Sequence, residues 1–302
     1  MKNFIDIQDF SKEEILRCID LAIQSKKAAT SDAKIAANKV LALIFEKKST
    51  RTRLSFDVAI RQLGGTSIVL DTSGIHLGSG NESLSDTAKT MSLYVDALVL
   101  RVNDHNSIIE MAKNSSIPVI NGLSNISHPC QVMAGLMTLV EERKTLENLN
   151  LVWMGPVTNV AHSWIEAFNK KLGFSLSILC PESFQQKYEK KCNNSKIEFN
   201  NDIFLSDISK DILSSADAVL TDTWESMGEK TDQKNLIELQ EYRVTQSLMD
   251  MTSSECLFMH CLPANRSQEV EAQVIDGPSS RVWKEAENRL HIQKQILIEC
   301  FN

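Results

Sequence analysis

The 302-residue sequence lacks the patterns that identify several common classes of protein. It has no excess of positive charge: its formal net charge is -7, whereas a general nucleic-acid surface depends on clustered Lys and Arg. No apolar run reaches the length of a membrane span, and the N-terminal stretch MKNFIDIQDFSKEEI lacks the apolar core of a signal peptide. We therefore expect a cytoplasmic protein with no nucleic-acid partner and no membrane association.

The seven cysteines form no recognisable framework. Their number is odd and no pair has CxxC spacing, so neither a disulfide scaffold nor a structural zinc site is expected. Two nucleotide-binding signatures are also missing, the GxxxxGKS/T of P-loops and the GxGxxG of dinucleotide-binding domains. Any anion bound by this acidic chain must therefore be held by local groups.

What the sequence does contain is an alternation of apolar, β-rich runs with helical patterns. The predicted strands cover residues 40–45, 66–70, 97–100, 118–120, 149–154, 174–179, 216–220 and 256–259. These runs are apolar throughout, which is typical of parallel strands covered by helices on both faces. The prediction is an α/β fold with two domains, each a parallel sheet flanked by helices.

The predicted domain boundary is the charged stretch EERKTLEN, near residues 142–149. A final amphipathic segment, residues 283–302, is expected to form a long helix that packs back on the first half of the chain. The predicted domains are residues 1–142 with this C-terminal helix, and residues 149–282. Interdomain helices would link them.

The stretch LALIFEKKSTRTRLSF joins a predicted strand to a predicted helix. Apolar residues recur at helical spacing from Phe56 to Leu63, and Gly64 can end the helix, so its start is expected at Ser49 or Thr50. Hydroxyl, N–H and guanidinium groups at the positive end of a helix are typical of a phosphate site. A capped helix start with solvated arginines is the alternative. The groups in question belong to Ser49, Thr50, Arg51, Thr52 and Arg53.

Other polar residues of the first half follow predicted strands, where open α/β sheets bind ligands. Arg101 comes directly after the run DALVL. In SHPCQ, Pro129 suits the first position of a helix, so His128 would lie at its cap and Gln131 in its first turn. His128 and Gln131 could face one ligand, although a structural cap is the alternative for the histidine.

Three strand ends of the second half are polar as well. GPVTN leads Asn159 into a helix, TDTWESMG contains Asp222, and HCLP contains Cys261. The carboxylate of Asp222 could pair with an ammonium group, and Asn159 with backbone N–H groups near Met227 could hold a carboxylate. A cysteine at such a position is more often inert packing than a reactive group.

Taken together and in this order, STRTR, the arginine after the strand, HPCQ, DTWESMG and HCLP resemble the transcarbamylase family over nearly the whole chain. STRTR and HPxQ imply carbamoyl phosphate as a substrate, whereas SMG and HCLP resemble the ornithine branch. The resemblance implies that a carbamoyl group passes from carbamoyl phosphate to the δ-amino group of L-ornithine, giving L-citrulline and phosphate. This reaction of arginine and citrulline metabolism requires no metal and no cofactor.

The resemblance also implies roles for individual residues. Arg101, His128, Asp222 and Cys261 would act in catalysis. The residues that would bind carbamoyl phosphate are Ser49, Thr50, Arg51, Thr52, Arg53, Arg101, His128, Gln131, Cys261, Leu262 and Arg289. Those that would bind ornithine are Asn159, Asp222, Ser226 and Met227. Residues 78–90 resemble a loop that reaches a neighbouring subunit's site, which implies a homotrimer.

Three stretches depart from the family pattern, one of which is HCLPAN, where Asn265 stands in place of the common histidine. Lys48 stands where proline is usual, and Pro156 with Asn159 replaces a glycine–aspartate turn and paired asparagines. A transferase that acts on a related amine without a carboxylate, such as putrescine, therefore stays open as an alternative. So does a non-catalytic homologue that binds a ligand or a partner enzyme, although that hypothesis predicts the loss of site residues, which are present here.

Overall fold

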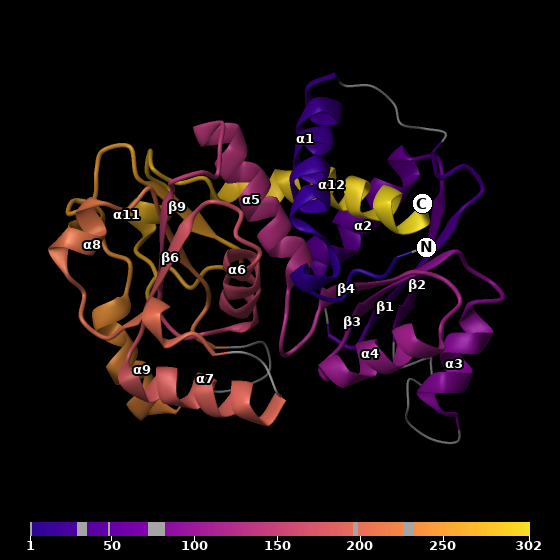
Figure 1. Ribbon diagram of the computed structural model, residues 1–302, viewed down its shortest axis with the longest axis horizontal. Helices are drawn as coiled ribbons and strands as arrows, with labels where there is room; N and C mark the ends of the chain where they lie inside the picture. Colours follow the sequence, from indigo (N-terminus) through magenta and orange to yellow (C-terminus); the bar gives the residue numbers. More distant parts are fainter. Residues whose placement is uncertain (1, 29–34, 48, 72–81, 196–198, 226–231) are drawn as a thin grey trace. The chain divides into compact units, whose positions relative to one another are not determined.

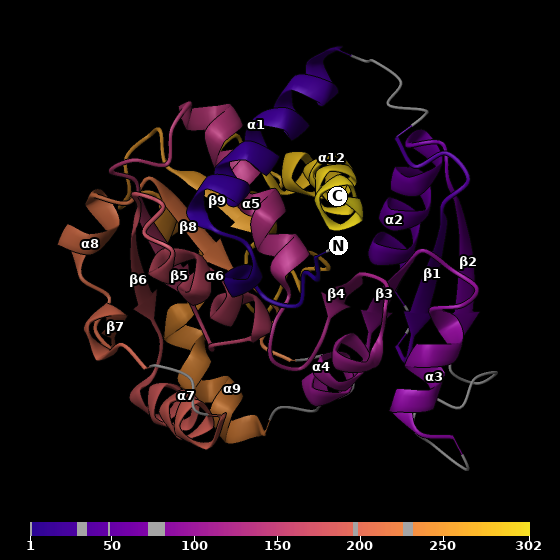
Figure 2. The same ribbon diagram turned by 45° about the vertical axis from the view of Figure 1, so that its right-hand side comes forward.

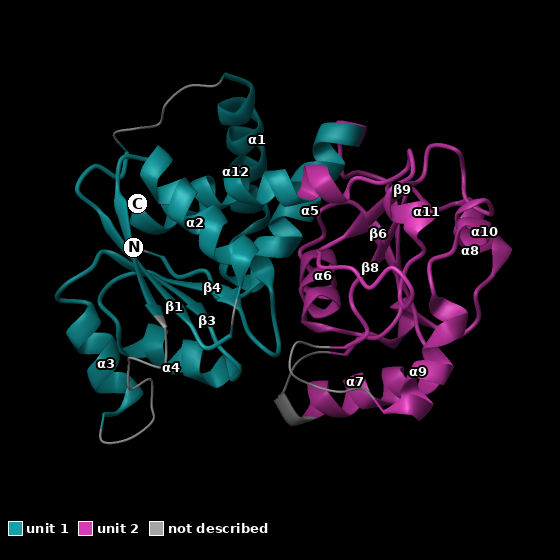
Figure 3. Cartoon of the chain, turned by 180° about the vertical axis from the view of Figure 1, so that it is seen from behind, with its two compact units in different colours: residues 1–142, 286–302 teal, residues 143–285 magenta. Residues whose placement is uncertain are grey.

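The computed structural model describes residues 2–28, 35–47, 49–71, 82–195, 199–225 and 232–302 (Figure 1). The chain divides into two compact units, which Figure 3 distinguishes by colour. Unit 1 comprises residues 1–142 and 286–302, and unit 2 comprises residues 143–285. The two breaks fall within α5 (Pro129–Arg143) and α12 (Val282–Phe301), so a helix continues across each of them.

Unit 1 is built on a four-stranded parallel sheet with the order β2-β1-β3-β4. The strands are β1 (Val40–Phe45), β2 (Thr66–Asp71), β3 (Ala97–Arg101) and β4 (Val119–Leu123). Figures 1 and 2 show α2 (Thr50–Gln62) and α12 on one face, and α3 (Leu84–Met91) and α4 (His105–Asn114) on the other. Because both faces are covered, every residue of β3 is buried.

The remaining elements of unit 1 come from its N-terminus. A short 3-10 helix, Ile7–Asp9, precedes α1 (Lys12–Ala28), which carries acidic residues in its first turn and lysines in its last. These charges suit the helix dipole. An ion pair between Arg17 and Glu299 joins α1 to α12.

Unit 2 contains a five-stranded parallel sheet with the order β7-β6-β5-β8-β9. Its strands are β5 (Asn150–Met154), β6 (Ser175–Leu179), β7 (Phe204–Leu205), β8 (Ala218–Thr221) and β9 (Leu257–His260). The helices are α6 (Asn159–Asn169), α7 (Glu182–Ser195), α8 (Lys210–Ser214), α9 (Gln233–Leu239), α10 (Gln246–Met249) and α11 (Ala272–Ile275). Short 3-10 turns cover Asn201–Ile203 and Gln240–Tyr242.

The core of unit 2 follows the alternation of side chains along its strands. Val152, Val219 and Phe258 belong to one buried cluster with side chains of α8, α10 and α11. Trp153 and Ile178, at alternating positions, are buried outside this cluster. Burial on both faces accounts for the continuously apolar strands.

Each sheet has one point where the chain changes direction across the strand order. In unit 1 this point lies between β1 and β3, and in unit 2 it lies between β5 and β8. Ligands of open α/β sheets bind beyond the carboxyl ends of the strands at such switch points. The start of α2 and Arg101 lie at the first, and the start of α6 and Asp222 at the second.

The α/β prediction with two parallel sheets is confirmed, and the ends of the predicted strands lie within three residues of the observed ones. Sequence reasoning missed β7, whose two residues are too short for a pattern. The predicted loop 78–90 is wrong in part, because residues 84–90 belong to α3; the Ser83 side chain accepts from the Asp86 N–H and begins that helix. Residues 78–81 lie outside the described part of the chain. Within that part, no helix is long and apolar enough to cross a membrane.

Candidate active site

The N-terminus of α2 is the first component of the site in unit 1. Ser49 is the N-cap, and its hydroxyl accepts from the Thr52 N–H at 3.3 Å, so the predicted helix start is confirmed. The side chain of Arg51 is half-buried, whereas that of Arg53 is exposed. Lys48 lies outside the described residues. The first turn of α2 therefore presents a helix dipole and a cation at the switch point of the sheet.

Thr52 holds two cations together at this helix end. Its buried hydroxyl oxygen accepts from Arg101 Nη1 at 3.3 Å and from Arg289 Nη2 at 3.1 Å. Arg101 ends β3 and Arg289 lies in α12, so the fold joins side chains far apart in sequence. Both arginine residues are at least 95% buried, and these two contacts are to a neutral oxygen. Clustered buried cations favour an anionic ligand.

Gln131, in the first turn of α5, belongs to the same cluster. Its Oε1 accepts from Arg289 Nη1 at 2.9 Å. An amide oxygen has two lone pairs, so this contact still permits the predicted acceptance from a ligand amide. The start of α5 at Pro129 is as predicted.

His128 precedes α5 and is buried. Burial holds its pKa well below the ordinary value, and the positive charges of Arg289, Arg101 and Arg51 lower that pKa further. The imidazole is therefore neutral near pH 7. It can donate one hydrogen bond to a carbonyl oxygen without adding a charge.

In unit 2, Asp222 and Cys261 form a direct contact at neighbouring strand ends. The Cys261 thiol donates to Asp222 Oδ1 at 2.7 Å, and the Thr223 N–H donates to the same oxygen, also at 2.7 Å. Asp222 Oδ2 accepts no hydrogen bond from the described residues. This geometry orients one carboxylate oxygen and leaves the other for a cationic ligand.

The turn after Cys261 is held by a buried pair that sequence reasoning missed. Leu262 has a φ of 52°, unusual for a branched side chain, and its N–H donates to His260 Nδ1 at 2.9 Å. The Nε2–H of His260 then donates to Glu269 at 3.2 Å. Glu269 also accepts from the Asn265 N–H. The pair fixes the backbone around Cys261, and no sequence motif pointed to Glu269.

The turn into α6 occupies the other side of the second switch point. Gly155 has a φ of 110°, and the Trp153 Nε1–H donates to the Pro156 carbonyl at 3.0 Å. Thr158 caps α6, and Asn159 is the first residue of that helix. A Cβ on Gly155 would lie 3.1 Å from Trp224 Nε1, so this turn requires glycine. Ser226 and Met227, also predicted to bind ornithine, lie outside the described residues.

The six cysteines other than Cys261 are buried. Burial raises the pKa of Cys18, Cys130 and Cys180 to about 12, and the pKa values of Cys192, Cys256 and Cys300 are also raised by burial. Cys261 is only half-buried. All seven cysteines are free.

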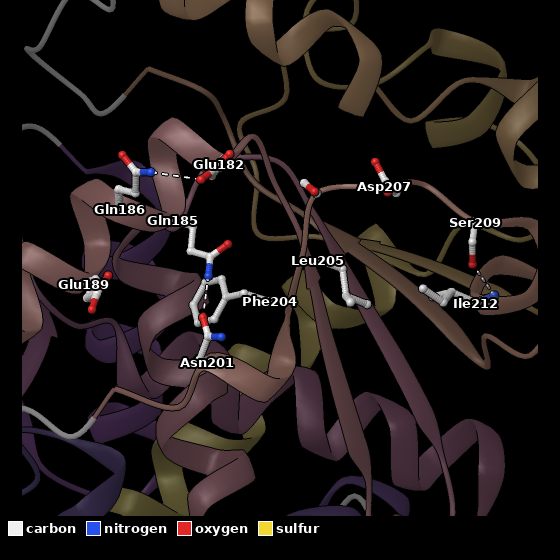
Figure 4. Close-up of a pocket in the computed structure, with 11 residues that line it drawn as sticks. Glu182, Gln185, Gln186, Glu189, Asn201, Phe204, Leu205, Asp207, Ser209 and Ile212 are labelled. Atoms are coloured by element: carbon white, nitrogen blue, oxygen red, sulfur yellow. Dashed lines mark hydrogen bonds between the residues drawn. The ribbon is translucent and has the colours of Figure 1, made fainter.

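A surface groove of unit 2 lies away from these residues, between α7 and the β7 edge of the sheet (Figure 4). Glu182, Glu189 and Asp207 line it, and none of the predicted site residues does. Three carboxylates do not suit an anionic substrate. Among the described residues, no three His, Cys, Asp or Glu side chains are grouped to hold a metal ion.

Buried guanidinium groups at one switch point and an oriented carboxylate at the other define a two-domain α/β protein suited to an anionic and a cationic small molecule. Residues 2–141 match the carbamoyl-P binding domain of aspartate/ornithine carbamoyltransferase, and residues 147–300 match the Asp/Orn binding domain. The chain therefore belongs to the aspartate/ornithine carbamoyltransferase family.

Individual relatives support this assignment. An ornithine carbamoyltransferase of Rhizorhabdus wittichii is 42% identical, covering 99% of this chain and 98% of its own length. One of Bradyrhizobium diazoefficiens is 43% identical, covering 100% and 97%. The solved ornithine carbamoyltransferase from Pyrococcus furiosus has a TM-score of 0.87 at 37% identity, covering 98% of this chain and 96% of that one.

Proposed function

We propose that this chain is an ornithine carbamoyltransferase, which transfers the carbamoyl group of carbamoyl phosphate to the δ-amino group of L-ornithine. The products are L-citrulline and phosphate. The observation that carries the proposal is the meeting of Arg101 and Arg289 on Thr52 at the N-terminus of α2. The two matched family domains and the named relatives agree with this substrate pair.

Unit 1, residues 1–142 with the C-terminal helix, would bind carbamoyl phosphate. Ser49, Thr50, Arg51, Thr52 and Arg53 would surround the phosphate at the start of α2, where N–H groups and cations favour an anion. Arg101 and neutral His128 would donate to the carbonyl oxygen, where negative charge grows as the amine attacks. Arg289 and Gln131, already bonded to each other, complete the site.

Unit 2 would bind ornithine. Asp222 would hold the α-ammonium group of ornithine. Asn159, at the start of α6, would contact the α-carboxylate together with Ser226 and Met227. An alkylammonium has a pKa near ~10.4, so the δ-amino group must lose its proton before it attacks. Cys261, in contact with Asp222, and the neighbouring Leu262 carbonyl are the proposed groups near that nitrogen.

The choice of amine is the test of this function. The purified protein should form its carbamoylated product much faster from ornithine than from putrescine or aspartate at equal concentrations. A preference for putrescine would move specificity to the Gly155–Pro156 turn and support the alternative amine. No product from any amine would contradict the proposal and favour a non-catalytic homologue.

We also propose a homotrimer in which the segment before α3, within residues 78–90, reaches a neighbouring site. Leu93 and Tyr94, just after α3, are 80% and 75% exposed, and large exposed apolar side chains are typical of interfaces. Replacing both by Glu should convert a trimer to a monomer in sedimentation velocity. The matched control is Ile237→Glu in unit 2, where Ile237 is 72% exposed. A monomeric wild type would contradict the assembly.

We also propose a cytoplasmic location, with which the seven free cysteines agree.

A further inference from the structure

A buried polar network joins three helices of unit 1 near the anion site. Its centre is Asn288 of α12, whose side chain is fully buried. The Asn288 amide nitrogen donates to Thr138 Oγ1 at 2.9 Å and to Glu141 Oε2 at 2.8 Å, both on α5. Its amide oxygen accepts from Lys26 Nζ of α1 at 2.7 Å. Three of the hydrogen bonds that this amide can make are therefore satisfied by protein.

Lys26 extends the network. Its ammonium group lies 3.4 Å from Glu141 Oε2 and 2.9 Å from Glu287 Oε2. Its side chain is only 17% exposed, so these contacts are screened less than those of a surface pair. The last turn of α1 is thus tied to both α5 and α12, which lie beside it in Figure 2.

Asn288 is directly followed by Arg289, the residue of α12 that reaches the anion site. Arg289 contacts Gln131 of α5 and Thr52 of α2, while Asn288 contacts α5 seven residues further on, at Thr138. Seven residues correspond to about 10 Å along a helix. These two neighbouring side chains thus fix α12 against α5 at two separated points, which restricts both its rotation and its sliding.

We infer that Asn288, together with Lys26, Thr138 and Glu141, is a positioning residue that sets the guanidinium of Arg289 in the carbamoyl phosphate site. The inference rests on the proposed function. A misplacement of about 1 Å in a site that depends on orientation can reduce the rate about 100-fold. A satisfied buried network also fixes one arrangement of its helices more sharply than apolar packing does.

The test is the steady-state kinetics of Asn288→Ala, with each substrate varied in turn. We expect the KM for carbamoyl phosphate to rise about tenfold, because Arg289 loses its fixed direction, and the KM for ornithine to change less than about twofold. Lys26→Met, which removes one support at the edge of the network, should raise the KM for carbamoyl phosphate less. It also keeps the inference testable if Asn288→Ala does not fold.

A double-mutant cycle separates positioning from general stabilisation. If Asn288 acts through Arg289, then Asn288→Ala should add little to the KM change caused by Arg289→Ala. The matched control is Arg17→Ala, because the Arg17–Glu299 pair also joins α1 to α12 but lies ten residues beyond Arg289 and is partly exposed. Its kinetics should equal those of the wild type.

Several results would overturn the inference. One is an unchanged KM for carbamoyl phosphate in both Asn288→Ala and Lys26→Met, even if the melting temperature falls. Another is full additivity of the Asn288 and Arg289 effects. Failure of the wild type to form citrulline would instead refute the proposed function, so the two failures are distinguishable.

Discussion

His128 is the residue whose charge state its surroundings control most strongly in the anion site. Burial and three arginines keep its pKa well below the ordinary value in the folded chain, whereas the unfolded chain should titrate near ~6.5. Above that pH both states are neutral and the histidine adds no pH dependence. Below it the unfolded state takes up a proton that the folded state does not, so stability falls as pH falls.

We predict that the wild type loses about 1 kcal/mol more unfolding free energy than His128→Gln between pH 7.5 and pH 5.5. Denaturant unfolding of both proteins at the two pH values measures this difference. His291→Gln is the comparison, because burial and nearby lysines also lower the pKa of His291, but it lies outside the anion cluster. Equal pH dependence in the wild type and His128→Gln would contradict this, because it would show that His128 binds a proton as readily in the folded chain as in the unfolded one.

Single residues also show where sequence reasoning stops. It identified the hydroxyls and arginines of the first turn of α2, but not which hydroxyl joins the cations. Ser49 is occupied as the helix cap, and this leaves Thr52 to hold Arg101 and Arg289. Arg289 was assigned only through family resemblance, because no local pattern relates α12 to the first turn of α2, 237 residues earlier. Asn288 escaped notice for the same reason, because its partner Thr138 lies 150 residues earlier. Glu269 pairs with His260 only nine residues away, but no sequence motif pointed to it.

At the scale of elements, the turn between β5 and α6 determines where Asn159 begins its helix. The hydrogen bond from the Trp153 indole to the Pro156 carbonyl is buried and joins residues three positions apart. It holds a turn whose sequence departs from the family pattern. A buried carbonyl without a hydrogen-bond partner costs about 1–3 kcal/mol, so the loss of this hydrogen bond should shift the turn.

Trp153→Phe should therefore raise the KM for ornithine several-fold while leaving the KM for carbamoyl phosphate nearly unchanged. Steady-state kinetics with each substrate varied measures both. Trp283→Phe serves as the control, because Trp283 is 64% exposed. Equal changes in the two KM values would mean that the turn supports the fold rather than the amine site.

The elements themselves were largely predictable. Continuously apolar strands and the starts of α2 and α5 followed from burial on both sheet faces and from capping chemistry. The predictions that failed concern short segments. β7 has only two residues, and residues 84–90 of the expected loop belong to α3, in which Leu84, Ala88 and Met91 form an apolar helical face. Neither segment has a sequence pattern long enough to distinguish a strand or helix from a loop.

At the scale of the whole molecule, the central claim is a division of labour. Each unit has a parallel sheet with one switch point, and each switch point carries groups of one predominant charge. Cations in unit 1 suit carbamoyl phosphate, and the Asp222 carboxylate in unit 2 suits an amine. The net charge of -7 does not oppose this arrangement, because the buried arginines act locally.

The most direct test of that claim is the initial rate of citrulline formation by the wild type, Arg51→Ala and Asp222→Asn, with each substrate varied separately. Arg61→Ala, on the exposed side of α2, is the control. We predict that Arg51→Ala lowers kcat/KM for carbamoyl phosphate by about 100-fold or more, and that Asp222→Asn acts mainly on kcat/KM for ornithine. Normal turnover by Arg51→Ala, or a collapse of carbamoyl phosphate binding in Asp222→Asn, would contradict the account.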